Sequence, residues 1–256
     1  MPKYRNRFRC QTAIAALLLL AVSGCATGSA EQRRRSAQGA YKLGLAYLAE
    51  GRPSPALQEF AKAEALTPDD PEVLNAAGLA YWARREHAVA EQKFQKATAL
   101  KPDYSEAWNN LGALYLDLGR YDAAIAPLEN ALKSVFYDTR ERALANLGWA
   151  YYKLGRAGDA EARLREALEA APDFPFAQKS LAIVLQERGE HREAVKLLTS
   201  ALEAMPDDAD AHLRKGLSQF RLGEREASRV EFEAAWRLAP GGEVGRSAKN
   251  YLDMLQ

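Results

Sequence analysis

A small residue recurs along most of this chain at nearly constant spacing. Successive members lie 34, 34, 36, 34 and 34 residues apart, and a bulky apolar residue follows each of them after 16 positions. Alanine or serine stands 12 positions after each small residue, and alanine stands 19 positions after it. A period of this length is typical of an array of helix-turn-helix repeats. The recurring small residues are Gly44, Gly78, Gly112, Gly148, Ala182 and Gly216.

This pattern predicts how the helices pack. Two antiparallel helices approach closely where one of them presents glycine or alanine to a bulky side chain of the other. In the third unit, Trp108, Leu111 and Tyr115 share one face of a first helix, and Gly119 breaks that helix. A single helix pair cannot bury both of its apolar faces, so stability requires stacked neighbours. The fold class expected is therefore an all-α solenoid.

The repeated residues resemble the tetratricopeptide repeat (TPR). Its W-x2-L-G-x2-Y and A-x3-F-x2-A signatures stand here as Trp108, Leu111, Gly112 and Tyr115, and as Ala90, Phe94 and Ala97. The resemblance implies a right-handed superhelical solenoid of six repeats, which we place at residues 37–70, 71–104, 105–140, 141–174, 175–208 and 209–240. Residues 241–256 carry one further amphipathic stripe, from Val244 to Leu255, and are expected to form a C-terminal capping helix.

The beginning of the chain has the architecture of a bacterial signal peptide. Four basic residues precede an apolar run from Ala13 to Val22 that is too short to span a bilayer. The run ends in Val22-Ser23-Gly24-Cys25, which resembles a lipobox. That resemblance implies removal of residues 1–24 and attachment of N-acyl and S-diacylglycerol lipid to Cys25. An ordinary signal peptide with an incidental cysteine is the alternative.

Residues 25–36 are small or polar and include three consecutive arginines, Arg33 to Arg35. We interpret them as the lipidated cysteine and a flexible tether, with the arginines either solvated or touching anionic lipid headgroups. Ala26 follows the cysteine, and in lipoproteins of enterobacterial type this implies sorting to the outer membrane. The array is then expected to face the periplasm.

Charge and motif content argue against several functional classes. The whole chain carries a formal charge of +1, and removing the four basic residues of the signal leaves 31 Lys and Arg against 34 Asp and Glu. Such a balance predicts no nucleic-acid partner. No nucleophile elbow, phosphate loop or paired zinc ligands occur, so we expect a non-enzyme without a metal or cofactor. An enzyme with an unrecognised site is the remote alternative.

Recognition of a partner is the expected role, and the first helix of each repeat is expected to line the binding groove. Positions one and four residues after the repeat glycine are mostly apolar or aromatic, and three asparagines nearby are candidates to hold a peptide backbone. Each residue has packing between repeats as its alternative role. The candidates are Leu45, Leu48, Leu79, Trp82, Asn109, Asn110, Leu116, Asn146, Trp149, Tyr152, Ile183, Leu217 and Phe220.

Six repeats, a lipobox and a terminal cap together resemble the outer-membrane pilotins of type IV pilus secretins, the PilF/PilW/Tgl group. The longer interval before the fourth repeat, where Val135 to Arg142 precede Asn146-Leu147-Gly148, strengthens the likeness. The resemblance implies a non-catalytic adaptor, monomeric when free, that carries a secretin subunit to the outer membrane. The alternative is a lipoprotein scaffold that recruits cell-wall enzymes or other envelope machinery.

Overall fold

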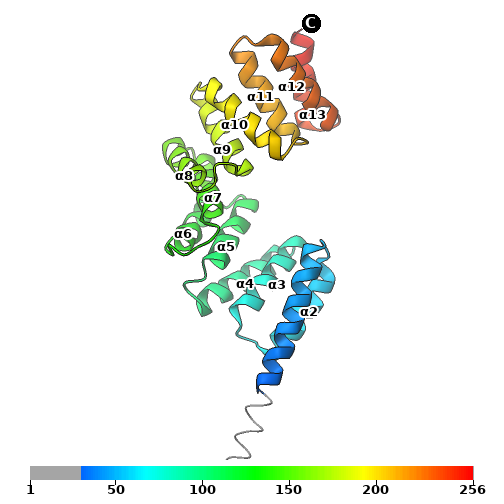
Figure 1. Ribbon diagram of the computed structural model, residues 1–256, viewed down its shortest axis with the longest axis vertical. Helices are drawn as coiled ribbons and strands as arrows, with labels where there is room; N and C mark the ends of the chain where they lie inside the picture. The colour runs from blue at the N-terminus through cyan, green and yellow to red at the C-terminus, as the bar shows by residue number, and fades with distance from the viewer. Residues whose placement is uncertain (1–29, 256) are drawn as a thin grey trace, which may run out of the picture. The chain divides into compact units, whose positions relative to one another are not determined.

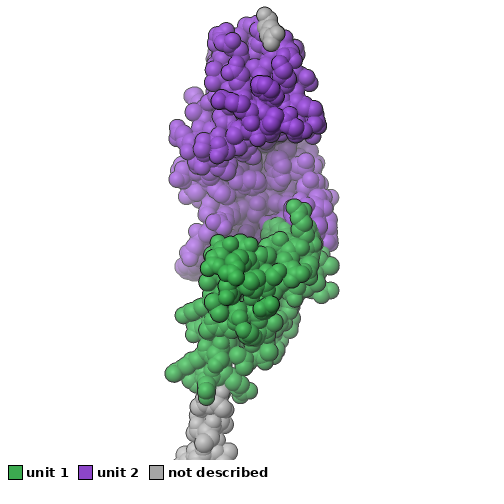
Figure 2. Space-filling model, turned by 90° about the vertical axis from the view of Figure 1, so that its right-hand side faces the viewer, with its two compact units in different colours: residues 1–102 green, residues 103–256 purple. Residues whose placement is uncertain are grey.

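A computed structural model describes residues 30–255 of the 256-residue chain, and every regular element in that range is an α-helix (Figure 1). The signal peptide expected at residues 1–24 and the expected lipid attachment at Cys25 lie outside the described residues. The helices form two compact units, Met1–Pro102 and Asp103–Gln256, which Figure 2 distinguishes by colour. We describe each unit by itself.

In the first unit the described helices make two antiparallel pairs. Pro71 begins the third of these helices, where its fixed φ and missing N–H suit the first turn. Asp70 caps it by accepting a hydrogen bond from the Glu72 backbone N–H at 2.9 Å. The helices span residues 30–49, Pro53–Leu66 (α2), Pro71–Ala83 (α3) and His87–Leu100 (α4).

The first helix corrects the expectation of a fully flexible tether. Residues 30–36 are helical and exposed, so the second half of the expected tether continues directly into the first repeat. Arg35 forms an i,i+4 ion pair with Glu31, with 3.0 Å between the arginine Nε and the carboxylate oxygen. Arginine and glutamate are good helix formers, and such pairs add a few tenths of a kcal/mol to a helix.

The second unit repeats the same hairpin and ends in one additional helix. Turns between the two helices of a pair use glycine with positive φ, as at Gly119, Gly155, Gly189 and Gly223. The helices are Ser105–Asp117 (α5), Tyr121–Ala131 (α6), Arg140–Lys153 (α7), Ala157–Ala170 (α8), Pro175–Glu187 (α9), His191–Ala204 (α10), Ala209–Arg221 (α11), Arg225–Leu238 (α12) and Glu243–Met254 (α13).

The small and bulky residues of the repeat meet as the spacing predicts. An added Cβ at Gly78 would lie 2.6 Å from the Phe94 ring, and one at Gly148 would lie 2.6 Å from Cγ of Leu164. Phe94 and Leu164 are fully buried. The expected all-α fold of stacked helix pairs is confirmed, because each glycine opens the space that the bulky residue of its partner helix fills.

Two local features complete the second unit. Helix α13 covers its last pair, where Tyr251 stacks on Phe232 with ring centroids 5.0 Å apart. The longer connection between α6 and α7 buries Tyr137 against Ala131 and Ala143. The neighbouring Phe136 is 89% exposed. Tyr137 therefore anchors this connection, which closes the third repeat without the proline that ends the others.

Candidate binding groove

A cavity of about 450 Å³ lies within the second unit, between residues of the first helices of the fourth, fifth and sixth repeats and of the capping helix. Its apolar side is formed by Ile183, Leu217, Phe220, Tyr251 and Met254. Polar and charged groups complete the lining: Tyr152, Gln186, Glu187, His191, Arg214, Ser218 and Arg221.

Helical spacing explains why these side chains converge. Ile183 and Gln186 lie three residues apart on α9, and Leu217 and Phe220 have the same spacing on α11, so each pair shares one helix face. The capping helix closes one side of the cavity, because the ring of Tyr251 lies edge-on to Phe220 with centroids 5.7 Å apart. The apolar surface of the cavity is therefore held by helices and not by loops.

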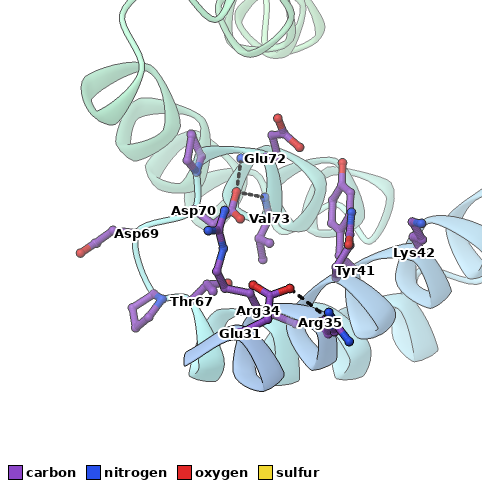
Figure 3. A pocket seen from close by; sticks show the side chains of 14 residues that line it. Glu31, Arg34, Arg35, Tyr41, Lys42, Thr67, Asp69, Asp70, Glu72 and Val73 are labelled. Atoms are coloured by element: carbon purple, nitrogen blue, oxygen red, sulfur yellow. Dashed lines mark hydrogen bonds and ion pairs between the residues drawn. The ribbon is translucent and has the colours of Figure 1, made fainter. Parts of the chain in front are cut away.

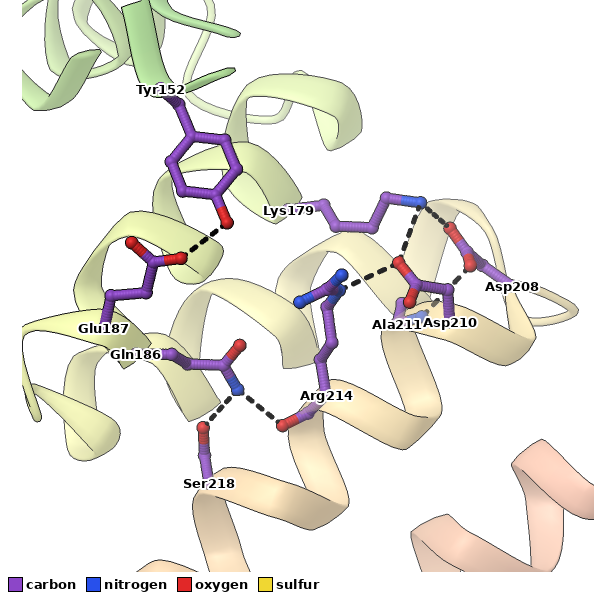
Figure 4. A network of polar contacts seen from close by, with 9 residues as sticks. All are labelled: Tyr152, Lys179, Gln186, Glu187, Asp208, Asp210, Ala211, Arg214 and Ser218. Carbon is purple, nitrogen blue, oxygen red and sulfur yellow. Dashed lines mark hydrogen bonds and ion pairs between the residues drawn. The ribbon is translucent and has the colours of Figure 1, made fainter. Parts of the chain in front are cut away.

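Hydrogen bonds fix the polar wall of the cavity (Figure 4). The Tyr152 hydroxyl donates to Glu187 across a distance of 2.6 Å. Gln186 Nε2 donates to the Arg214 carbonyl oxygen at 2.7 Å and to Ser218 Oγ at 2.6 Å. Burial and then the hydrogen bond to Glu187 raise the pKa of Tyr152 to about 12. The phenol is therefore a neutral hydrogen-bond donor at physiological pH.

Ion pairs position the cationic side of the cavity. Arg214 Nε lies 2.9 Å from a carboxylate oxygen of Asp210, and Lys179 Nζ lies 2.6 Å from Asp208. Asp208 also accepts a hydrogen bond from the Ala211 backbone N–H. Burial opposes ionisation of Asp208, but the Lys179 and backbone hydrogen bonds outweigh it and lower the pKa of this carboxyl. The start of α11, and with it Arg214, is thereby tied to α9.

Four of the expected groove residues meet at this cavity: Tyr152, Ile183, Leu217 and Phe220. Ile183 is only 4% exposed, however, so it forms part of the wall and offers little surface of its own. Trp149 is half-buried and does not line the cavity. Its ring packs against the ring of Tyr152, with centroids 5.1 Å apart, and so supports a residue that does line the cavity.

The asparagines are used inside the array. Asn146 Nδ2 donates to Asn109 Oδ1 at 3.0 Å, and Asn109 is 7% exposed. These two residues connect α5 with α7, which corrects the expectation that Asn109 presents a free amide to a peptide. Asn110 and Leu116 are half-buried on α5 and lie outside the cavity lining.

The groove candidates of the first unit differ in how far they are packed. Leu48 lies against the core that contains Phe60 and Ala77. The Trp82 ring meets Phe94 edge-on, with centroids 6.4 Å apart. Leu79 is half-buried, whereas Leu45 remains 37% exposed. None of the four lines the cavity of the second unit, so a binding role for them stays a prediction.

A larger, more polar hollow of about 850 Å³ lies in the first unit, between the first helix and the connection from α2 to α3 (Figure 3). Several of its charged groups already have partners. Asp70 accepts from the backbone N–H groups of Glu72 and Val73, and Arg35 pairs with Glu31. Half of the residues that line this hollow are charged, compared with a quarter of those that line the cavity of the second unit. The cavity of the second unit is therefore the better candidate for binding an apolar segment.

Sequence reasoning missed the contributions of Arg221, Met254 and His191 to the cavity. Met254 and Tyr251 lie three residues apart on α13, and this spacing is the signal that the cap faces the groove. Arg221 ends α11 one position after Phe220, so its place at the rim follows from the same register.

Neither metal chemistry nor a membrane span emerges from the described residues. Between residues 30 and 255, no three His, Cys, Asp or Glu side chains gather in a way that suits a metal ion. Within the same range, no helix combines the length and apolar character needed to cross a bilayer.

Two family models, both described as tetratricopeptide repeat, match residues 103–173 and 179–243. The expected repeat type is thereby confirmed, and the protein is a TPR protein. No curated protein matches the sequence significantly.

Solved structures show the same fold. PilF from Pseudomonas aeruginosa aligns with a TM-score of 0.79 at 20% identity, over 86% of this chain and 99% of its own. PilW, a widely conserved type IV pilus biogenesis factor, aligns with a TM-score of 0.74 at 25% identity, over 83% and 98%. YrrB, a TPR protein with an unusual peptide-binding site, gives 0.56 at 22% identity, over 75% and 97%.

Proposed function

We propose that this protein is a non-catalytic, lipid-anchored adaptor that holds an apolar segment of a secretin subunit at the outer membrane. The observation that carries the binding role is the cavity of the second unit. Its apolar side, made of Leu217, Phe220, Tyr251 and Met254, is combined with polar groups of Gln186 and Arg214 that are joined by a hydrogen bond. Apolar cavities with a few oriented polar groups are the common form of protein binding sites.

The size and chemistry of the cavity favour a short stretch of polypeptide. A volume of about 450 Å³ accommodates a few apolar side chains, and the surrounding groups offer donors and acceptors to a backbone. Helices hold these groups before binding, so little conformational entropy is lost when the segment enters. The proposal concerns capture of a partner and no chemical step.

The likeness to PilW supports the choice of partner. PilW acts in type IV pilus biogenesis, and its chain aligns with this one over almost its whole length. We therefore propose the pilus secretin as the client. In this proposal the acyl chains on Cys25 keep the adaptor on the periplasmic face of the outer membrane. Confinement to a surface raises the effective concentration of adaptor and secretin for each other.

The cavity can be tested with two apolar-to-charged substitutions. Met254 is 64% exposed at the cavity, and Val230 is 60% exposed on α12, outside the cavity lining. We expect Met254→Glu to reduce crosslinking to the secretin at least tenfold, because a carboxylate is costly in an apolar contact. Val230→Glu should leave crosslinking unchanged. A photo-crosslinker at Arg221 provides the readout in cells, and circular dichroism verifies that both variants are folded.

Equal secretin capture by wild type and Met254→Glu would contradict the proposed site. Crosslinks to a cell-wall enzyme, with none to the secretin, would favour the scaffold alternative. For the anchor, Cys25→Ser should leave the array folded, release it from the membrane and lower the amount of secretin multimers. Normal multimer levels with a fully soluble protein would contradict the role of the anchor.

A further inference from the structure

The first helix has an exposed basic tip. Residues 30–36 are all exposed, although Arg33 lies on the same face as the buried Ala37, one turn further along. The first two turns of the helix are therefore exposed, although Glu31, Arg34 and Arg35 also border the hollow beside the connection from α2 to α3. This basic tip, residues 30–36, carries three arginines and one acidic residue, Glu31.

The charges of the basic tip are only partly neutralised. Arg35 pairs with Glu31, whereas Arg33 and Arg34 have no ion-pair partner within residues 30–255. Lys42 is exposed seven residues after Arg35, on the same side of the helix. The three consecutive arginines are spread around the helix, since each residue turns the direction by about 100°. Arg34 borders the hollow that Asp69, Asp70 and Glu72 also line, whereas Arg33 does not, so the positive charge of the tip is least compensated at Arg33.

The position of the tip in the chain brings it close to a membrane. Five residue steps separate Cys25 from Ala30, which allow about 17 Å at full extension. Electrostatic attraction to an anionic membrane surface acts over roughly 8 Å at physiological salt. This range is about half of the maximum distance between Cys25 and the tip. If Cys25 carries acyl chains, the tip is held within or near the range of that attraction.

The helix direction adds to the charge. The chain enters the first helix from the side of Cys25, so the amino end of the helix, with its partial positive charge, faces the same way as the arginines. Basic residues near an anionic leaflet each contribute roughly fivefold to membrane affinity. The three arginines of the tip therefore provide a second attachment beside the acyl chains.

We propose that the basic tip binds anionic phospholipid headgroups of the membrane that holds the acyl chains. The inference rests on the lipid anchor of the proposed function. A flexible tether could also bring Arg33, Arg34 and Arg35 to headgroups, but only a helix transmits that attachment to the first repeat. The first repeat is then held against the membrane surface and does not move freely around the anchor.

The test uses the acylated full-length mature protein in vesicles. With Cys25 acylated, the mature chain has no other cysteine, so Gln38→Cys gives a unique thiol for a fluorophore two residues beyond the tip. A headgroup-linked quencher reports the distance of the label from the bilayer. We expect quenching to be at least threefold stronger in phosphatidylethanolamine/phosphatidylglycerol vesicles than in phosphatidylethanolamine/phosphatidylcholine vesicles, and to fall in 0.5 M NaCl.

Charge variants identify the residues responsible. Replacing Arg33, Arg34 and Arg35 together by Gln should remove the dependence on phosphatidylglycerol, whereas replacing all three by Lys should retain it. The matched control replaces three exposed arginines of the second unit, Arg192, Arg225 and Arg237, by Gln and should behave as wild type. Quenching that is equal in both vesicle types, or unaffected by the tip substitutions, would overturn the inference. A dependence on the tip arginines that appears only when an acidic protein is added would also overturn the inference.

Two measurements separate this inference from the proposed function. The mass of the N-terminal peptide first establishes whether Cys25 is acylated, and an unacylated chain contradicts the anchor itself. Acylated protein without any charge dependence contradicts only the role of the tip. On the unacylated Cys25→Ser chain, sedimentation with phosphatidylglycerol vesicles should weaken roughly fivefold for each tip arginine replaced by Gln. Unchanged sedimentation would again overturn the inference.

Discussion

The turn between α3 and α4 contains an arginine where the corresponding turns contain glycine. Arg85 has a φ of 62°, and the equivalent position elsewhere in the described chain is occupied by glycine, as at Gly51 and Gly119. A side chain in this left-handed conformation costs roughly 1 kcal/mol. We expect Arg85→Gly to raise the free energy of unfolding by about 0.5 to 1 kcal/mol, measured by urea denaturation. Gly155→Arg, in an equivalent turn, should lower it, and stabilisation by both changes would contradict this reasoning.

The repeat glycines set the distance between paired helices. A Cβ at Gly148 would lie 2.6 Å from Leu164 Cγ and 3.1 Å from the Ala160 carbonyl oxygen. Because backbone must move as well as a side chain, Gly148→Ala should destabilise the protein by about 1 to 3 kcal/mol. Gly158→Ala is the control, since nothing lies within 4 Å of its added methyl group. Thermal denaturation measures the effect. Equal decreases in the melting temperatures of Gly148→Ala and Gly158→Ala would argue against this steric explanation.

The lowered pKa of Asp208 predicts that the stability of the folded protein depends on pH. The pKa of this carboxyl is lowered in the folded protein by Lys179 and backbone hydrogen bonds, which outweigh burial. Because the folded pKa lies below the unfolded value of about 3.9, the stabilisation is complete above pH 4 and disappears as pH falls through the folded pKa. Asp208→Asn should therefore lower the melting temperature at pH 7 and approach wild type near pH 2. Asp207→Asn, an exposed neighbour, is the control, and a pH-independent difference for Asp208→Asn would contradict the assignment.

At the scale of elements, the capping helix stabilises the last repeat. Tyr251 stacks on Phe232 and lies edge-on to Phe220, so Tyr251→Ala removes two aromatic contacts. We expect a loss of roughly 2 to 4 kcal/mol, because truncation of a packed aromatic side chain leaves a cavity. In stacked repeats each helix pair depends on its neighbours. Hydrogen exchange should therefore accelerate first in α11 and α12, and only later in α5 and α6.

The mutant Met254→Ala provides the matched control for the capping helix, because Met254 is largely exposed on the same element. Its exchange pattern should resemble wild type. Uniform acceleration over the whole second unit in Tyr251→Ala would indicate that the unit unfolds as one cooperative body, and that the cap does not act locally.

The helices and their pairing are predictable because the residues of the same packing contact recur at the same spacing in each repeat. Gly78 opposite Phe94 is one such contact, and a fixed spacing suffices to find it. The side-chain surface was less predictable. Ile183 has the groove register but is covered by its neighbours, and Asn109 bonds to Asn146 on another repeat. Exposure and cross-repeat hydrogen bonds depend on how repeats stack, which a pattern within one repeat does not contain.

The start of the first helix was also missed, for a different reason. Small and polar residues before the first repeat are typical of a tether, yet Glu31 and Arg35 have the i,i+4 spacing that supports a helix. The packed part of the first repeat supplies the turns onto which residues 30–36 add, so extension of the helix requires no new nucleation. The charge spacing of Glu31 and Arg35, considered together with the adjoining helix of the first repeat, predicts this extension.

At the scale of the whole molecule, the proposed attachment and capture use residues far apart in the sequence. Attachment depends on Cys25 and the basic tip, whereas capture depends on the cavity between α7 and α13. Substitutions at distant sites without shared partners usually have additive effects. Cys25→Ser should therefore bind a purified secretin segment in solution as tightly as wild type, although it leaves the membrane. Met254→Glu should remain on the membrane and lose the segment.

Combining the two changes distinguishes a simple adaptor from a coupled one. If anchoring only raises effective concentration, the solution affinity of Cys25→Ser equals that of wild type, and the double variant equals Met254→Glu. Isothermal titration calorimetry measures the affinities, and membrane fractionation measures the attachment. A loss of solution affinity in Cys25→Ser beyond about threefold would mean that attachment changes the cavity itself. Capture and anchoring would then be one linked property, and the cavity would be complete only in the membrane-bound protein.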